Sequence, residues 1–224
     1  MKVKFLGGVR TVTGSATLLE KDPLKWLVDC GMHQGGKTLE ERNRGLQPYH
    51  AEDLAFVLLT HAHIDHSGLI PKLVKEGFRG RVICTKATSD LCEVMLRDSG
   101  HIQEIEAEWQ NRKGKRSGKE AMEPLYTIKD AEESLHYFKP IRYDEIFSPP
   151  EGMKVRFQDA GHILGSAIIE IWSQEGGSDD ACLRDQPTPA ETRASRRREP
   201  LRRRQGGLGV SPRPELRPKA QSNS

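Results

Sequence analysis

The sequence predicts a layered α/β domain over residues 1–178, followed by a disordered Arg/Pro-rich tail over residues 179–224. Short apolar runs bounded by glycine or charged residues are typical of strands, and longer segments show the apolar spacing of helices. The strands come first along the chain and then alternate with the helices, which is the order expected of a layered α/β domain. At 224 residues, the chain is long enough for one sizeable core or two small ones.

The expected elements follow from these patterns in chain order. We expect strands at residues 3–6, 15–20, 25–28, 56–59, 81–84, 154–160 and 167–172. We expect helices at residues 69–76, 89–97, 102–111 and 129–136. The basic stretch at residues 112–119 is interpreted as a solvated loop, with a phosphate-contacting patch as the alternative.

Charge and aromatic content divide the chain at the same boundary. Residues 1–178 hold 24 basic and 26 acidic side chains, whereas residues 179–224 hold 11 and 6. The tail has no Phe, Tyr or Trp and contains six of the 13 prolines, so it lacks the apolar groups that would offset the entropy cost of ordering. Because residues 1–178 are near neutral, their charge alone gives no support for nucleic-acid binding.

Apolar and cysteine content exclude two classes of protein. The longest apolar stretch, residues 54–59, is far shorter than the roughly 20 residues of a membrane-spanning helix, so no membrane partner is expected. The four cysteines have no CxxC spacing, which argues against a secreted disulfide scaffold. Since the N-terminus also lacks the apolar segment of a signal peptide, we expect a cytoplasmic protein.

One cluster of ligand-type side chains stands out between residues 61 and 66. His61, His63, Asp65 and His66 follow directly after the expected strand 56–59. His61 and His63 are two positions apart, so in extended backbone both rings lie on the same side. Asp65 and His66 follow at the turn into a helix, where they can direct a second ligand pair toward a neighbouring point. Imidazoles and a carboxylate suit Zn²⁺, with Mn²⁺ and iron as competitors.

Two further residues occupy similar positions at the ends of strands. Asp29 follows the expected strand 25–28, and His162 follows the strand 154–160. Taken alone, Asp29 is a turn former and His162 is a loop histidine. Beside the cluster at residues 61–66, His162 becomes the natural third imidazole for one metal ion. Asp29 becomes a carboxylate that holds a ligand ring in its tautomer.

These motifs resemble those of a known superfamily. HAHIDHSG at residues 61–68 is similar to the HxHxDH signature of the metallo-β-lactamase superfamily. The flanking segments FLGGVRTVTGS, LVDCGMHQGG, ATSDLCEVMLRDSGHIQE and FQDAGHILGSAIIEI resemble its β-CASP branch of RNA-processing nucleases, related to the cleavage-and-polyadenylation endonuclease. The resemblance covers residues 1 to about 178. It implies the N-terminal part of a stacked αββα sandwich with two zinc ions at the edge of its sheets.

The resemblance also implies a role for each site residue. His61, His63 and His162 would hold one zinc, while Asp65 and His66 would hold the other and serve in catalysis. In the family, a hydroxide that bridges the two metals attacks phosphorus. The expected substrate is therefore RNA, and the expected reaction is phosphodiester hydrolysis.

The sequence departs from the family after the expected strand 167–172. It shows no Gly-Asp-Leu-Gly-Arg-like segment, whose Asp bridges both metals in the family, and no RNA-clamping β-CASP domain. We therefore expect a truncated domain with weak or no nuclease activity and a tendency to aggregate. The tail is interpreted as a shifted reading frame or as a genuine divergent segment, and the nucleotide sequence would decide between these.

Two other functions stay open at this point. HxHxDH builds only the metal site, so a hydrolase of a thioester, lactone or β-lactam is the first alternative. The second is a catalytically silent relative that binds a metal or a partner without turnover. Residues 87–104 and the helical stretch after them resemble the nuclease branch, which favours the RNA-processing hydrolase. The sequence does not predict an oligomeric state.

Overall fold

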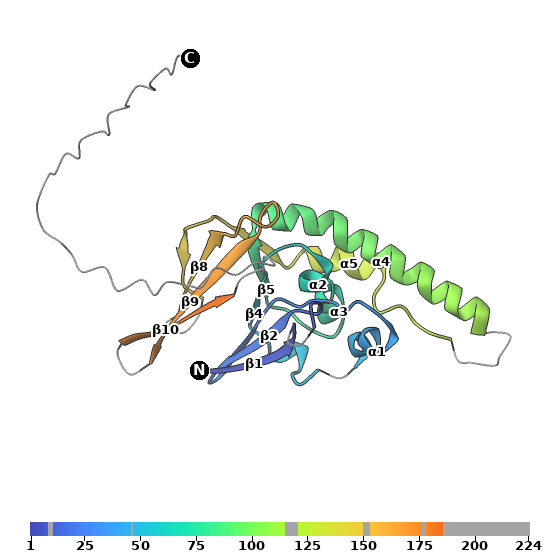
Figure 1. Ribbon diagram of the computed structural model, residues 1–224, viewed down its shortest axis with the longest axis horizontal. Coiled ribbons are helices and arrows are strands. Elements are labelled where there is room, and N and C mark those ends of the chain that lie inside the picture. Colours follow the sequence, from blue (N-terminus) through green and yellow to red (C-terminus); the bar gives the residue numbers. More distant parts are fainter. Residues whose placement is uncertain (9–10, 46, 115–120, 150–152, 176–177, 186–224) are drawn as a thin grey trace, which may run out of the picture. The chain divides into compact units, whose positions relative to one another are not determined.

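The computed structural model describes residues 1–8, 11–45, 47–114, 121–149, 153–175 and 178–185, all within one compact unit (Figure 1). The strands are β1 (Lys2–Gly7), β2 (Ala16–Lys21), β3 (Leu24–Val28), β4 (Phe56–Leu58), β5 (Arg81–Thr85), β6 (Phe138–Ile141), β7 (Ile146–Phe147), β8 (Met153–Asp159), β9 (Ala167–Glu175) and β10 (Ser178–Asp185). The helices are α1 (Lys37–Glu40), α2 (Ile64–Ser67), α3 (Ile70–Lys75), α4 (Lys86–Gly114) and α5 (Ile128–Leu135), with 3₁₀ turns η1 (Glu41–Arg44) and η2 (Ala51–Asp53).

Two sheets pack against each other. The first has the strand order β1-β2-β3-β4-β5-β6, and the second has the order β10-β9-β8-β7. Strands β3 to β6 run parallel, so their carboxyl ends meet at one edge of the sheet. Apolar side chains at alternate positions fill the space between the sheets: Leu19, Trp26, Val28, Phe56, Leu58 and Ile83 from the first, and Met153, Val155, Phe157, Ala167, Ile169 and Ile171 from the second.

Helices cover the other face of the six-stranded sheet. Leu27 and Val57 point to this face, because they alternate with the residues of the inter-sheet core. They share a second apolar core with Ile70 of α3, Leu96 of α4 and Ala131 of α5. The described residues thus form a helix layer, a six-stranded sheet and a four-stranded sheet, which confirms the expected α/β part of an αββα sandwich.

The long helix α4 replaces the two shorter helices expected at residues 89–97 and 102–111. Between them, Ser99 and Gly100 interrupt the apolar spacing of the sequence. A Cβ on Gly100 would lie 3.0 Å from the backbone of Ile128, at the start of α5. The Ser99 hydroxyl is hydrogen-bonded to the buried Tyr126 hydroxyl at 2.7 Å. These small residues therefore allow α4 and α5 to pack closely and do not end the helix.

Several short elements carry too few residues for a periodic signal, and the sequence patterns missed them. They include α1, α2, β6 and the two-residue strand β7. Strand β6 contains Pro140, which is tolerated because β6 lies at the edge of its sheet.

The structure differs from the expected tail at residues 179–185. These residues form most of β10, which pairs antiparallel with β9. The physical reason is that the backbone of an edge strand offers hydrogen-bonding groups to a neighbouring segment, and that segment can pair with it whatever side chains it carries. In the sequence, a Gly-Gly pair separates the two strands, which is typical of a hairpin connection. Residues 186–224 lie outside the described residues, so their disorder stays a prediction.

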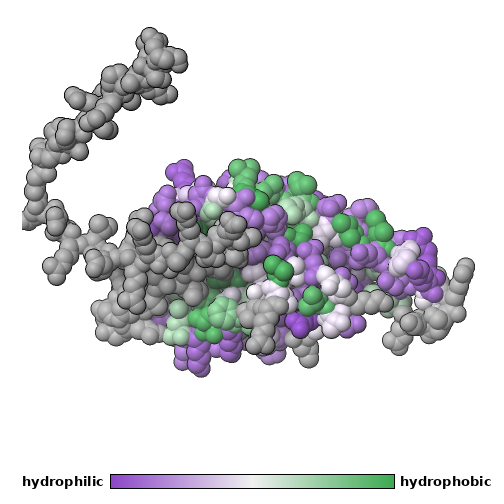
Figure 2. Space-filling model, viewed as in Figure 1, coloured by the Kyte–Doolittle hydropathy of each residue, from purple (hydrophilic) through white to green (hydrophobic). Residues whose placement is uncertain are grey.

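The helices and the surface show no long apolar segment among the described residues, as the sequence predicts. None of the helices in the described ranges is long and apolar enough to cross a membrane. Figure 2 shows apolar patches interspersed with hydrophilic side chains over the visible face. Of the expected basic loop, residues 112–114 belong to the end of α4, and residues 115–119 lie outside the described residues.

Candidate metal centre

The expected ligands at residues 61–66 lie at the carboxyl end of β4. The amide of Leu59 donates to the carbonyl of Ile83 at 2.9 Å and so extends the pairing of β4 with β5. His61 and His63 come next, and the short helix α2 begins directly after His63. The two rings lie together as the spacing predicts: they meet edge to face, with 3.0 Å between His61 Nε2 and His63 Nδ1.

His162, in the loop between β8 and β9, completes a cluster of three histidines. Its Nε2 lies 3.4 Å from His63 Nδ1, and one donor nitrogen of each ring lies within 4.8 Å of the other two. Two zinc–nitrogen bonds of about 2.0–2.1 Å at a tetrahedral angle separate their nitrogens by about 3.3 Å. The distances therefore fit one metal ion shared by His61, His63 and His162.

Hydrogen bonds at the start of β9 place His162 there, although it is 99 residues from His63 in the chain. The amide of Ala167 donates to the carbonyl of Thr60 at 2.9 Å, which joins the two loops. The amide of His162 donates to the buried hydroxyl of Ser166 at 3.1 Å. The loop between β8 and β9 of the four-stranded sheet thus places the third histidine at the edge of the six-stranded sheet.

Asp65 and His66, the second expected ligand pair, lie beside the three-histidine cluster. Asp65 Oδ2 is 3.8 Å from His66 Nε2, and the His66 ring centroid is 4.0 Å from that of His61. Both side chains are partly exposed. Within the described residues, no third His, Cys, Asp or Glu joins this pair in a ligand group.

Asp29 is buried and fixes the orientation of the His66 ring. Its Oδ2 lies 2.6 Å from His66 Nδ1, so Nδ1 donates and Nε2 is left facing Asp65. The amide and the hydroxyl of Thr60 donate to Asp29 Oδ1 at 2.8 and 2.9 Å. The Ser15 hydroxyl donates to Oδ2 at 3.4 Å. This is the arrangement in which a carboxylate holds a ligand ring in one tautomer.

Thr60 plays a corresponding part for His61, and the sequence patterns did not single it out. The Thr60 hydroxyl donates its hydrogen bond to the Asp29 carboxylate, so its oxygen accepts a hydrogen bond from His61 Nδ1 at 2.9 Å. His61 then presents Nε2 to the other histidines. The only sequence signal is a polar residue between an apolar strand and the HxHxDH signature.

Backbone hydrogen bonds hold the loop of the expected ligands, residues 61–66 (the ligand loop), against the turn after β3. The amide of Cys30 donates to the carbonyl of His66 at 2.8 Å. Gly31 approaches the same loop so closely that a Cβ there would lie 1.7 Å from the carbonyl oxygen of Asp65. The turn that carries Asp29 and the loop that carries the ligands are therefore one packed unit.

Burial favours the uncharged form of two of the three histidines. It lowers the pKa of His61 to about 3, and the neighbouring His66, His63 and His162 act in the same direction. Burial also lowers the pKa of His63. A neutral imidazole has the lone pair that a metal ion needs, so His61 and His63 are ready to bind a metal at neutral pH without releasing a proton.

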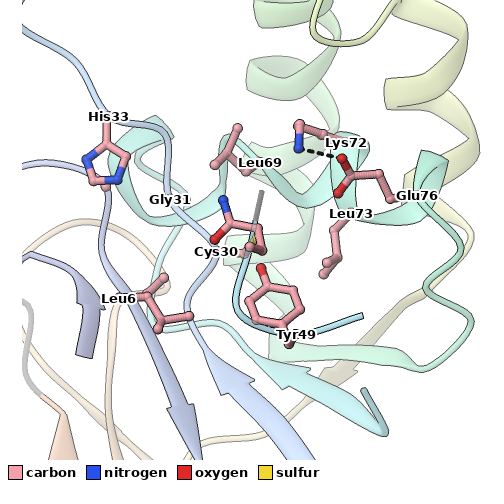
Figure 3. Close-up of a pocket in the computed structure, with 12 residues that line it drawn as sticks. Leu6, Cys30, Gly31, His33, Tyr49, Leu69, Lys72, Leu73 and Glu76 are labelled. Carbon is pink, nitrogen blue, oxygen red and sulfur yellow. Dashed lines mark hydrogen bonds and ion pairs between the residues drawn. The ribbon is translucent and has the colours of Figure 1, made fainter. Parts of the chain in front are cut away.

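A small cavity lies beside Cys30 on the helix side of the six-stranded sheet (Figure 3). Its volume of about 20 Å³ is close to that of one water molecule, so it is too small for a substrate. Burial raises the pKa of the Cys30 thiol to about 12, and Lys72 pairs with Glu76 at the cavity wall, 2.5 Å apart. A neutral, buried thiol is a poor nucleophile.

Comparisons with known proteins find similar chains. The family model described as "Metallo-beta-lactamase superfamily" matches residues 9–145. Ribonuclease TTHA0252 of Thermus thermophilus is 36% identical over 169 residues, which are 75% of this chain and 34% of that protein. Transcription termination factor FttA of Methanocaldococcus jannaschii is 33% identical over 176 residues, 79% of this chain and 26% of that protein. The solved structure of BJP-1, a subclass B3 metallo-beta-lactamase of Bradyrhizobium japonicum, covers 79% of this chain and 56% of its own, with 15% identity and a TM-score of 0.44.

The chain spans about a third of the length of this ribonuclease and about a quarter of that of the termination factor. The resemblance predicted from the flanking motifs is confirmed by these matches, because one of the relatives is named a ribonuclease.

Proposed function

The chain belongs to the metallo-beta-lactamase superfamily, and from this we propose that its three-histidine cluster is the metal centre of an RNA phosphodiester hydrolase. The observation that carries the proposal is the convergence of His61, His63 and His162 to within 4.8 Å. Similarity to a ribonuclease and to a transcription termination factor supports RNA as the substrate.

We propose zinc as the metal, because three neutral imidazoles are a typical zinc ligand set; manganese and iron compete by ligand type. Asp65 and His66 would hold a second ion. Zinc bound there would polarise a phosphoryl oxygen and lower the pKa of water toward about 7. The residues of the chain prepare the site: Thr60 holds His61 by Nδ1, and Asp29 holds His66 in the same way.

A second ion would be held by fewer side chains than the first. Because the described residues supply only Asp65 and His66 for it, we expect zinc close to one equivalent per chain and weak RNA cleavage. A catalytically silent relative would bind the metal and show no turnover. A hydrolase of a thioester, lactone or β-lactam would use the same metal site, and none of the described contacts favours it.

Buried cysteines support a reducing compartment. Cys30, Cys84 and Cys92 are all unpaired and buried. Since free thiols persist most readily in the cytoplasm, we propose that location for the protein.

Single-turnover cleavage of a labelled single-stranded RNA, with and without a chelator, tests the proposed function. A chromogenic thioester and a lactone serve as the competing substrates. His162→Ala should lower both the zinc content and the cleavage rate, the latter by at least about tenfold. His101→Ala, an exposed histidine on α4, is the matched control and should change neither. Chelator-sensitive hydrolysis of the thioester or lactone without RNA cleavage would contradict the proposal.

A further inference from the structure

A groove beside the three-histidine cluster has no part in the chemistry proposed so far. Its volume is about 690 Å³, which lies in the range of ligand-binding clefts. His162 lines it, together with the start of α4, the residues at and after the end of β6, and the loop between β8 and β9. His162 therefore belongs both to the metal cluster and to this groove.

Buried hydrogen bonds hold the walls of the groove in place. The hydroxyls of Thr85 and Thr88 both donate to the carbonyl of Gly165, at 2.7 and 2.8 Å. Gly165 has a φ of +83°, and a Cβ there would lie 2.5 Å from the Thr88 amide nitrogen. The loop that carries His162 is thus packed directly on the first turn of α4 (Figure 1). The groove is a fixed feature of the fold.

Of the three Lys, Arg and Asp side chains that line the groove, all exposed, two are positive. Lys86 and Arg142 line it, and both are exposed. Lys86 pairs with Asp90 one helical turn away, where 73% and 56% of the two side chains stay accessible to solvent. Arg142 forms no ion pair with any residue that the structure describes. Asp159 is the acidic residue of the lining, and its Oδ1 accepts the amide of Gly161 at 2.9 Å.

A second groove continues this positive path along β6. Its volume is about 530 Å³, and it shares Lys86 and Arg142 with the first groove. It adds Lys139, with Glu145 as its acidic residue. Three cationic side chains therefore line the two grooves, and the two that are shared lie in the same groove as His162. Proteins that bind single-stranded nucleic acids use such a positive groove to follow the phosphate backbone.

Apolar side chains form the part of the first groove that is closest to His162. Ile163 and Leu164 follow it directly, and 73% of Leu164 is exposed. An exposed apolar side chain next to cations suits a nucleotide, which has an apolar base face and a charged phosphate. An acidic peptide would use the cations and leave this apolar surface in water.

We propose that the first groove binds the backbone of single-stranded RNA next to the phosphate that is cleaved, with Arg142 and Lys86 contacting the neighbouring phosphates. The planar guanidinium of Arg142 can donate two parallel hydrogen bonds to one phosphate. The inference rests on the proposed function, because it takes the histidine cluster as the place of cleavage.

Binding can be measured separately from cleavage. The probe is a fluorescein-labelled single-stranded RNA of about 10 nucleotides, and the readout is its anisotropy with the full chain carrying His63→Ala. In that background, Arg142→Glu and Lys86→Glu should each raise Kd about tenfold at low salt. Each should also reduce the slope of log Kd against log salt concentration by about 0.7, the value for one phosphate contact on a single strand. Lys129→Glu, an exposed lysine of α5 outside both grooves, is the matched control and should do neither.

The inference and the proposed function fail in different ways. If the unmodified chain cleaves RNA, and both groove variants bind the probe as tightly as Lys129→Glu, the groove inference is overturned and the function stands. If the chain cleaves no RNA, and the groove variants still weaken binding, the groove binds RNA as proposed, but the proposed function is wrong and the bound RNA does not lie next to a cleaved phosphate. Circular dichroism of each variant confirms that it is folded before its binding is compared.

Discussion

Asp29 holds the side chains of the proposed metal centre in place, although it is not among the three histidines proposed to bind the first metal. Only 1% of it is exposed, and its carboxylate accepts hydrogen bonds from His66, Thr60 and Ser15. A buried carboxylate is costly unless its lone pairs are satisfied, and these donors satisfy them. The carboxylate in turn decides which nitrogen of His66 is left for a metal.

Asp29→Asn should weaken metal binding without removing a ligand. The amide can turn its NH₂ toward His66 Nδ1, and this would reverse the tautomer that leaves Nε2 available. We expect the affinity of the Asp65–His66 pair for a second zinc ion, added above the first equivalent, to fall by about 10–100-fold, measured by competition with a chromogenic chelator. Asp144→Asn is the matched control, because Asp144 also has a positive φ and lies outside the site. Equal zinc affinity in the two variants would count against the role of Asp29.

His33 provides a prediction about pH that does not depend on the metal. The His33 ring is 9% exposed, its Nδ1 has no hydrogen-bond partner among the described residues, and burial lowers its pKa. The unfolded chain therefore takes up a proton near pH 6.5 that the folded chain resists. The contribution of the neutral His33 ring to the free energy of unfolding is therefore fully present above this pH, and it is lost as the pH falls below it.

Urea unfolding in chelator at about pH 7.5 and about pH 5.5 measures this effect. The free energy of unfolding should fall less on acidification in His33→Leu than in the unmodified chain. His50→Leu, at an exposed position, should keep the original difference. If the difference in His33→Leu equals that of the unmodified chain, burial of His33 does not cause the loss of stability at low pH. Using the difference between two pH values cancels the packing change that either substitution makes.

Motif spacing predicted which side chains lie together, but it missed Thr60, which holds one of them. His61, His63, Asp65 and His66 lie together because two-residue spacing and a turn into a helix are local geometry. Thr60 could not be predicted in the same way, since a hydroxyl at the end of a strand has no characteristic spacing. Its role exists only once Asp29, 31 positions earlier, lies beside it in the fold.

At the level of elements, the turn after β3 and the loop after β4 behave as one unit. Parallel pairing of β3 with β4 brings the two segments to the same edge of the sheet. The central strands β3, β4 and β5 lie within one residue of their expected bounds, because strands buried on both faces are continuously apolar. Edge strands such as β6 and β10 lack this pattern, and backbone pairing with a neighbour defines them instead.

Gly31→Ala should disrupt this unit. Its new Cβ would lie 1.7 Å from the carbonyl oxygen of Asp65, so either the turn or the ligand loop must move. Overpacking of this kind costs about 1–3 kcal/mol of stability, and the displaced loop should also bind less zinc. Thermal unfolding and zinc content after dialysis measure the two effects.

Gly45→Ala is the control for this substitution. Among the residues that the structure describes, a Cβ at Gly45 would meet only the carbonyl of Arg42, at an ordinary 3.4 Å, and the backbone φ of −66° suits alanine. We expect its stability and zinc content to match those of the unmodified chain. If Gly31→Ala also matches them, the close approach of the two segments does not support the metal centre.

For the molecule as a whole, the proposed metal would join the two sheets. His61 and His63 follow β4 of the six-stranded sheet, whereas His162 precedes β9 of the four-stranded sheet. The sheets otherwise meet through their apolar core and through few polar contacts, such as the bond from Ala167 to Thr60. A ligand that binds only the folded state stabilises it in proportion to the logarithm of its concentration. Metal binding should therefore appear as stability of the entire domain.

Zinc at about 100 times its Kd should stabilise the chain by about 2.7 kcal/mol. For a domain of this size, that corresponds to a rise in Tm of roughly 5–10 °C, measured by thermal unfolding with and without a chelator. His162→Ala should lose most of this rise, because among the described residues it is the one proposed ligand next to the four-stranded sheet, and His101→Ala should keep it. A full zinc-dependent rise in His162→Ala would show that the metal is held within one sheet, by His61, His63 and the neighbouring Asp65–His66 pair. The two sheets would then be joined by their apolar core and their few polar contacts, without the metal.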